Sequence, residues 1–241
     1  PGLGLDPSEP VGEARDAALA VFADMLLADP AHGDVAACTI GQGLYRGFIE
    51  GDRDEIFARA TAACMKAFEL NENDFEVHRM MSAVFLSAHE YKLAEEHGRK
   101  AHNMNPNDPR ILSGFGEVLV RNGSTAKGLE LLNKAMELDP VPQGQSNSDN
   151  RLKDLALGFF FAQDFSRCEE VAERIEGHDL RSWLLLTYAK QVNDTLDKSS
   201  ADYKTKLTKL MPEDWAAAID RFHIPNDEIK ADLLKFAEAL N

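Results

Sequence analysis

The chain has 241 residues, of which 44% are hydrophobic and 28% are charged, a composition typical of a folded protein. Its 41 acidic residues outnumber its 26 basic residues and give a formal net charge of −15. Such an acidic surface repels phosphate backbones and anionic lipid headgroups, which argues against nucleic acids and membrane surfaces as partners. The sequence contains no apolar run near the roughly 18 residues that a membrane-spanning helix needs.

The amino-terminal sequence and the cysteines bear on the cellular setting. The first residues, PGLGLD, include neither a Met nor a basic segment followed by an apolar block. We therefore expect no secretory signal peptide and take the chain to be part of a longer protein. Cys38, Cys64 and Cys168 are far apart and form no CxxC pair, which argues against a disulfide framework or a zinc site. This pattern predicts buried thiols in a reducing cytoplasm.

The sequence repeats itself every 34 residues. Residues 66–72, 100–106 and 134–140 read KAFELNE, KAHNMNP and KAMELDP. Each copy ends in a polar break, where Asn or Asp can cap the following helix and Pro can interrupt the preceding one. A fixed period of this length is typical of stacked helical repeats. Because no segment alternates like a strand, the spacing predicts an all-helical chain.

The residues at fixed positions of the repeat resemble the tetratricopeptide repeat (TPR) family. Small residues recur in the second helix, where residues 75–108 carry Ala94 and Ala101 and residues 109–142 carry Gly128 and Ala135. Small side chains let two helices approach closely. The resemblance implies an all-α, TPR-type right-handed α-solenoid of antiparallel helix pairs, with 12 or 13 helices.

The same resemblance divides the chain into repeats and ends. Four TPR-like repeats are expected at 41–74, 75–108, 109–142 and 149–177, with residues 141–148 lengthening one junction by six residues. Terminal units of a solenoid need a polar outer face and are therefore atypical. We expect a disordered or artificial start at 1–7, capping helices at 8–40, and a degenerate fifth pair followed by capping helices at 178–241.

The sequence contains no complete catalytic, cofactor-binding or metal-binding motif. The GxGxxxG run at 41–47 lacks a preceding strand, and the seven histidines form no HExxH motif. We therefore expect no catalytic residue, no cofactor and no metal site in this region. An enzyme that uses the groove of the repeats as an active site is an alternative that no motif supports.

The resemblance implies a concave groove lined by the first helices of the repeats. The residues that match the groove positions of the family are Tyr45, Arg46, Arg79, Leu86, Arg110, Ser113, Glu117, Arg121, Lys153, Phe160 and Phe161. The cations among them favour a protein or peptide partner with acidic or carboxylate groups. Alternatively, these cations form intramolecular ion pairs with neighbouring Glu residues.

Three consecutive aromatic residues cannot all face one side of a helix. Phe159 matches the core aromatic of the repeat, so Phe160 or Phe161 must point elsewhere. Either the next helix pair covers this ring, or the ring lines the groove as an apolar anchor for a peptide.

The sequence therefore predicts a non-catalytic protein–protein interaction module of a larger bacterial protein, located in the cytoplasm. TPR pairs, an irregular pair and a tail with LMP at 210–212 and IPND at 224–227 resemble regions attached to class III adenylate/guanylate cyclases and winged-helix regulators. That resemblance implies the regulatory part of an adenylate cyclase, with the catalytic domain upstream. The alternative is a self-associating scaffold that forms a homodimer.

Overall fold

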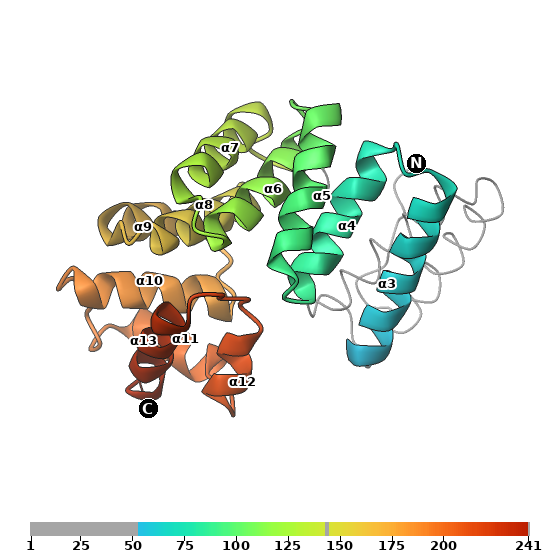
Figure 1. Cartoon of the computed structure of the whole chain (residues 1–241). Coiled ribbons are helices and arrows are strands. Elements are labelled where there is room, and N and C mark those ends of the chain that lie inside the picture. Colours follow the sequence, from blue (N-terminus) through green and yellow to red (C-terminus); the bar gives the residue numbers. More distant parts are fainter. Residues whose placement is uncertain (1–52, 143–144, 241) are drawn as a thin grey trace, which may run out of the picture. The chain divides into compact units, whose positions relative to one another are not determined.

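Residues 53–142 and 145–240 are described in this computed structural model of the chain. They form eleven helices, and these two ranges contain no strand (Figure 1). The expectation of an all-α fold built from antiparallel, TPR-like helix pairs is confirmed. Tyr45, Arg46, the expected start at 1–7 and the capping helices at 8–40 lie outside the described residues.

The chain divides into two compact units, residues 1–84 and 85–241. In the first unit, α3 (Arg53–Leu70) precedes α4 (Phe75–Ser87), which continues past the boundary. Asp74 caps α4, because its carboxylate accepts a hydrogen bond from the Glu76 amide at 2.8 Å. Ala67 and Val77 are buried beside the turn between the two helices.

The cysteines only partly follow the sequence-based expectation. Cys64 of α3 is a disulfide cysteine, so the prediction of a free thiol is wrong for this residue. Cys168 is free and buried, as expected. A disulfide at Cys64 is not the pattern expected of a reducing cytoplasm.

The repeat period is preserved in the bounds of the helices. The helix α6 (Pro109–Arg121) begins and ends 34 residues after α4, and α7 (Thr125–Leu138) does so after α5 (Tyr91–Met104). The next pair, α8 (Asp149–Phe161) and α9 (Phe165–Ala172), begins 40 residues after α6 and α7. The six additional residues fall between α7 and α8, where the sequence predicts the longer junction.

The turn within each helix pair has the same backbone geometry. His89, Gly123, Gln163 and Asp194 all have positive φ angles, between 56° and 85°. In each turn the next amide donates to a carbonyl five residues earlier, as in the bond from Ser124 to Leu119, which is the Schellman closure of a helix end. The recurrence includes Asp194, so α10 (Leu180–Val192) and α11 (Ala201–Leu210) continue the series.

Asparagine side chains join successive pairs in the same way at two places. The Asn122 amide at the end of α6 donates to the carbonyl of Tyr91, the first residue of α5, at 3.0 Å. The Asn193 amide at the end of α10 donates to the carbonyl of Phe165, the first residue of α9, at 3.1 Å. The helix α10 therefore occupies the position of a first helix relative to α9.

Small residues bring the two helices of a pair into close contact. A Cβ atom on Gly128 of α7 would lie 2.7 Å from the carbonyl oxygen of Gly116 of α6. In the next pair the Cys168 thiol donates to the carbonyl of Ala156 at 3.4 Å. Burial raises the pKa of Cys168 to about 12, so this thiol stays protonated and acts as a small packing residue.

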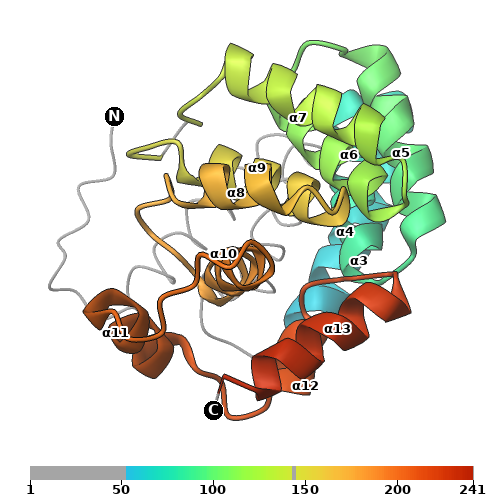
Figure 2. The same cartoon turned by 90° about the vertical axis from the view of Figure 1, so that its left-hand side faces the viewer.

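The two last helices belong to the core of the second unit. The six-residue α12 (Trp215–Asp220) and α13 (Asp227–Glu238) contact each other, and α13 also contacts α10 (Figure 2). Trp183 of α10, Ile219 of α12 and Leu233 of α13 are buried in one apolar cluster. The core therefore extends from the helix pairs into the C-terminal helices.

Candidate functional site

Most cations at the predicted groove positions have acidic partners within the chain. Arg79 of α4 forms an ion pair with Glu76 at 2.5 Å. Leu86, also predicted to line the groove, is buried. In the second unit Arg110 bonds Asp108 at 2.6 Å and Lys153 bonds Asp179 at 3.1 Å. For these residues the structure shows the intramolecular pairs that the sequence analysis gave as the alternative.

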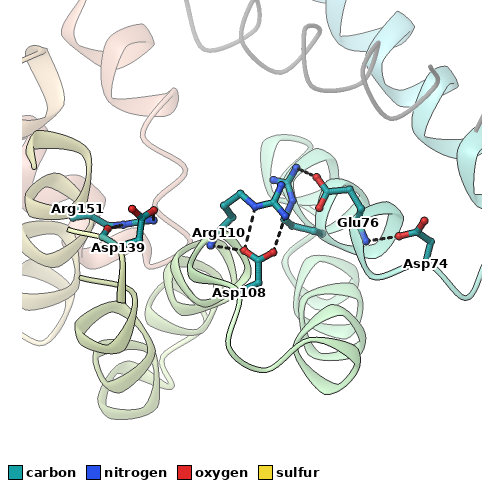
Figure 3. Close-up of polar contacts among 7 residues, drawn as sticks. Asp74, Glu76, Asp108, Arg110, Asp139 and Arg151 are labelled. Atoms are coloured by element: carbon teal, nitrogen blue, oxygen red, sulfur yellow. Dashed lines mark hydrogen bonds and ion pairs between the residues drawn. The ribbon is translucent and has the colours of Figure 1, made fainter. Parts of the chain in front are cut away.

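The acidic partners also set where the helices begin. Asp108 caps α6 by accepting from the Arg110 amide at 2.9 Å, and its carboxylate also accepts from the Arg110 guanidinium (Figure 3). Asp179 caps α10 through the Ser182 amide at 2.8 Å. Figure 3 also shows Arg151 of α8 beside Asp139, to which it donates at 3.0 Å. These ion pairs fix the first turns of α6, α8 and α10.

Side chains from three first helices meet in what we call the inner polar cluster, which consists of Ser113, Glu117, Arg121, Asp154 and Arg181. The Ser113 hydroxyl of α6 donates to the Asp154 carboxylate of α8 at 2.5 Å. The Arg181 guanidinium of α10 lies 3.7 Å from the Glu117 carboxylate of α6. The predicted groove residues Ser113, Glu117 and Arg121 are thus brought together, with two residues that the sequence analysis did not identify.

Both of these missed residues had a signal in the sequence. Arg181 is the second residue of α10, as Arg110 is the second residue of α6. Extending the groove register to the fifth pair would therefore have identified Arg181. Asp154 is the sixth residue of α8, a position that TPR repeats place near the groove, so the same register would have identified it as well.

The environment of Asp154 disfavours its charged form. Burial and, after it, the nearby Glu117 carboxylate raise the pKa of this carboxyl, which lies at about 6 when all its neighbours act together. The Ser113 hydrogen bond and the charges of Arg181 and Arg151 act in the opposite direction. Asp154 therefore exchanges its proton close to neutral pH.

Asp154 should make stability depend on pH. Because the pKa is higher in the folded state, folding favours the protonated form, and the free energy of unfolding falls as pH rises from about 4 to about 6. A shift of about two pH units corresponds to a loss of at most about 3 kcal/mol. Asp154→Asn should remove this loss, so that the variant is more stable than the wild type at pH 7.5 in urea unfolding. The exposed Asp202→Asn is the control, and identical pH profiles for wild type and Asp154→Asn would contradict the prediction.

Arg121 lies in the interior, although the sequence analysis expected it to be exposed to a ligand. Its side chain has 0% exposure, and it bonds Glu117 at 2.7 Å. The same guanidinium donates to the backbone carbonyls of Phe222 and His223, in the connection between α12 and α13. Arg121 is therefore occupied by the C-terminal part of the chain itself.

The packing of α10 against α8 determines which aromatic residues at the end of α8 are covered. Phe160 is buried and packs edge-on against Tyr188 of α10, with ring centroids 5.5 Å apart. The next helix pair thus covers Phe160, which is one of the two explanations given above. Phe161 is partly buried, and its ring centroid lies 5.9 Å from the Arg121 guanidinium carbon.

The face that carries these residues is open at one end and closed at the other. We call this the inner face, formed by the inner polar cluster together with Arg110, Lys153, Phe160 and Phe161. Near the starts of the helices Arg110 and Arg181 are 53% and 28% exposed. Near the end of α6 the side chain of Arg121 is fully covered. Access is therefore greatest at the N-terminal ends of α6, α8 and α10.

Metal binding and membrane crossing each require particular groups or helices. Among residues 53–142 and 145–240, no group of three or more His, Cys, Asp or Glu side chains could hold a metal ion. Within the same part of the chain, no helix combines the length and the apolar composition that crossing a membrane requires.

Comparisons with known proteins give structural similarity only. No protein-family model matches the chain, and no curated protein sequence matches it. A mutant of MamA is 10% identical over 73% of this chain and 96% of its own, with a TM-score of 0.49. MamA from AMB-1 is 10% identical over 73% and 98%, with a TM-score of 0.48. PilF from Pseudomonas aeruginosa is 17% identical over 77% and 96%, with a TM-score of 0.35. Because these scores lie below 0.5, our fold description depends on the helix bounds and turns of the chain itself.

Proposed function

We propose that this region is a non-catalytic protein–protein interaction module that holds a segment of a partner on its inner face. The supporting observation is that this face already holds a non-helical piece of polypeptide. Residues 221–226 contain no helical residue, and Arg121 binds two consecutive carbonyls of this segment. Hydrogen bonds to main-chain groups are a general way to recognise a peptide.

The open end of the inner face has the chemistry to bind acidic groups. Arg110 and Arg181 are the second residues of α6 and α10, and Lys153 is the fifth residue of α8. All three therefore lie near helix N-termini, where the helix dipoles also favour anions. The Arg110 guanidinium is 53% exposed, and the Asp179 carboxylate that pairs with Lys153 is 50% exposed. A partner carboxylate can therefore reach Arg110 from solvent while Asp108 stays in place as the cap of α6. This supports a partner with acidic or carboxylate groups.

The proposal is tested by removing two cations from the open end. In Lys153→Gln/Arg181→Gln the two helices lose their cations without gaining repulsion. A charged hydrogen bond contributes about 1.5–3 kcal/mol, so recovery of the bound partner should fall at least about tenfold. The measurement is affinity capture with the whole chain as bait, with bound proteins quantified by mass spectrometry.

The matched control is Arg99→Gln/Lys127→Gln. These residues lie on the second helices α5 and α7, are 56% and 57% exposed, and are likewise paired with Glu. The proposal expects the control to capture the same proteins as the wild type. Equal losses in both double variants would show that capture depends on overall charge rather than on the inner face.

The finer parts of the sequence-based hypothesis stay predictions. These are the attachment to an adenylate cyclase or a winged-helix regulator, the bacterial and cytoplasmic setting, and the alternative of a homodimeric scaffold. The mass of the chain in solution, measured by light scattering, separates a homodimer from a monomer. A dimer that persists in Lys153→Gln/Arg181→Gln would place self-association outside the open end of the inner face.

A further inference from the structure

Residues 221–226 connect α12 to α13 and cross the end of α6. The segment reads RFHIPN and has no helical residue. The carbonyls of its second and third residues, Phe222 and His223, accept hydrogen bonds from one nitrogen of the buried Arg121 guanidinium. Its last residue, Asn226, caps α13 by accepting from the Glu228 amide at 3.0 Å. The segment is thus held at both ends by defined polar contacts.

Side chains along the segment alternate between two surroundings. Phe222 and Ile224 are buried in the apolar cluster that also contains Phe160 of α8 and Leu185 of α10. Between them His223 contacts His89 instead, with the Nδ1 and Nε2 atoms 3.1 Å apart. The Phe222 and His223 amides donate to the carbonyls of Ile219 and Asp220, and His223 has a φ angle of 52°, so the segment starts as a turn. Main-chain bonds thus hold this turn while Phe222 and Ile224 enter the apolar cluster.

We propose that residues 221–226 are an intramolecular ligand of the inner face, so that a partner segment can reach the closed end only by displacing them. This inference rests on the proposed function, because it concerns the same face. It identifies the partner segment by chemistry, as a turn with two apolar side chains separated by one residue. Its main chain would offer two consecutive carbonyls to Arg121.

Because residues 221–226 are covalently joined to α12 and α13, they compete strongly with a free partner segment for the inner face. A covalently attached ligand acts at an effective concentration in the millimolar range for short linkers. A free segment of the same sequence should therefore bind the wild-type chain weakly. It should bind well once the attached segment has lost its two buried side chains.

The experiment uses a fluorescent peptide with the sequence of residues 219–228, and fluorescence anisotropy measures its binding to the whole chain. We expect Phe222→Ser/Ile224→Ser to bind the peptide at least about tenfold more tightly than the wild type. Adding Arg121→Gln to that variant should abolish the gain in peptide affinity, because the guanidinium that donates to the two carbonyls is lost. A peptide in which the residues matching Phe222 and Ile224 are both Ser is the control and should not bind.

Two outcomes would overturn the inference. One is equal binding of the peptide to the wild type and to Phe222→Ser/Ile224→Ser. The other is loss of cooperative melting in that variant, which would show that the segment is an indispensable part of the core rather than a ligand. Capture through Lys153 and Arg181 at the open end tests the proposed function separately, so failure of the one and failure of the other can be distinguished.

Discussion

Arg121→Met should lower the free energy of unfolding of the second unit by about 3–5 kcal/mol. Replacing this arginine leaves the Glu117 carboxylate without its closest cation in a buried site, and breaking a buried ion pair costs about this much. The carbonyls of Phe222 and His223 lose their donor as well. Urea unfolding followed by tryptophan fluorescence measures the change, since Trp183 and Trp215 both lie in the second unit.

Arg99→Met provides a matched control for this measurement. Arg99 of α5 also pairs with a Glu four residues earlier, at 2.5 Å, but it is 56% exposed and the pair lies on the surface. Its loss should cost less than about 1 kcal/mol. If the two variants unfold at the same urea concentration, the burial of Arg121 and its contact with the C-terminal segment contribute nothing.

Gly128→Ala should destabilise the second unit by about 1–3 kcal/mol, although alanine is the better helix former. The added Cβ would lie 2.6 Å from Val120 Cγ2, 2.7 Å from the Gly116 carbonyl oxygen and 2.8 Å from the Val120 amide nitrogen. Two of these atoms belong to the backbone of α6, so α6 and α7 must separate. Overpacking of this kind typically costs about 1–3 kcal/mol.

Gly114→Ala makes the same chemical change where there is room for it. Gly114 lies on the exposed side of α6, and a Cβ there has no atom within 4 Å. This variant should gain about 0.5–1 kcal/mol from the reduced flexibility of the unfolded chain. Urea midpoints that move in opposite directions for the two glycines would confirm the close contact, and a stabilised Gly128→Ala would contradict it.

The contrast between Gly128 and Gly114 also shows how much of the fold the sequence determines. The 34-residue spacing, the caps at Asp74 and Asp108 and the longer junction at 141–148 were all readable from the sequence. Local spacing and capping chemistry control these features, so the helix bounds follow from them. Gly128 stands where the family has alanine, and pattern alone would favour Gly128→Ala as a stabilising change. Only the distance to Gly116 reverses that expectation.

The candidate site was less predictable, for a physical reason. The sequence placed Ser113, Glu117 and Arg121 on one helix face, because a helical period fixes which residues share a face. It could not show what covers that face. The covering segment, residues 221–226, lies about 100 residues further along the chain than Arg121. Contacts over such a separation depend on how the C-terminal helices fold back, and no periodicity encodes this.

The central claim, that Arg121 holds residues 221–226 on the inner face, is tested most directly by amide hydrogen exchange. In the wild type the amides of this segment should exchange slowly, because the segment is docked on the end of α6. In Arg121→Met they should exchange much faster, while the amides of α8 keep their protection. Fast exchange of residues 221–226 in the wild type, unchanged by Arg121→Met, would contradict the account.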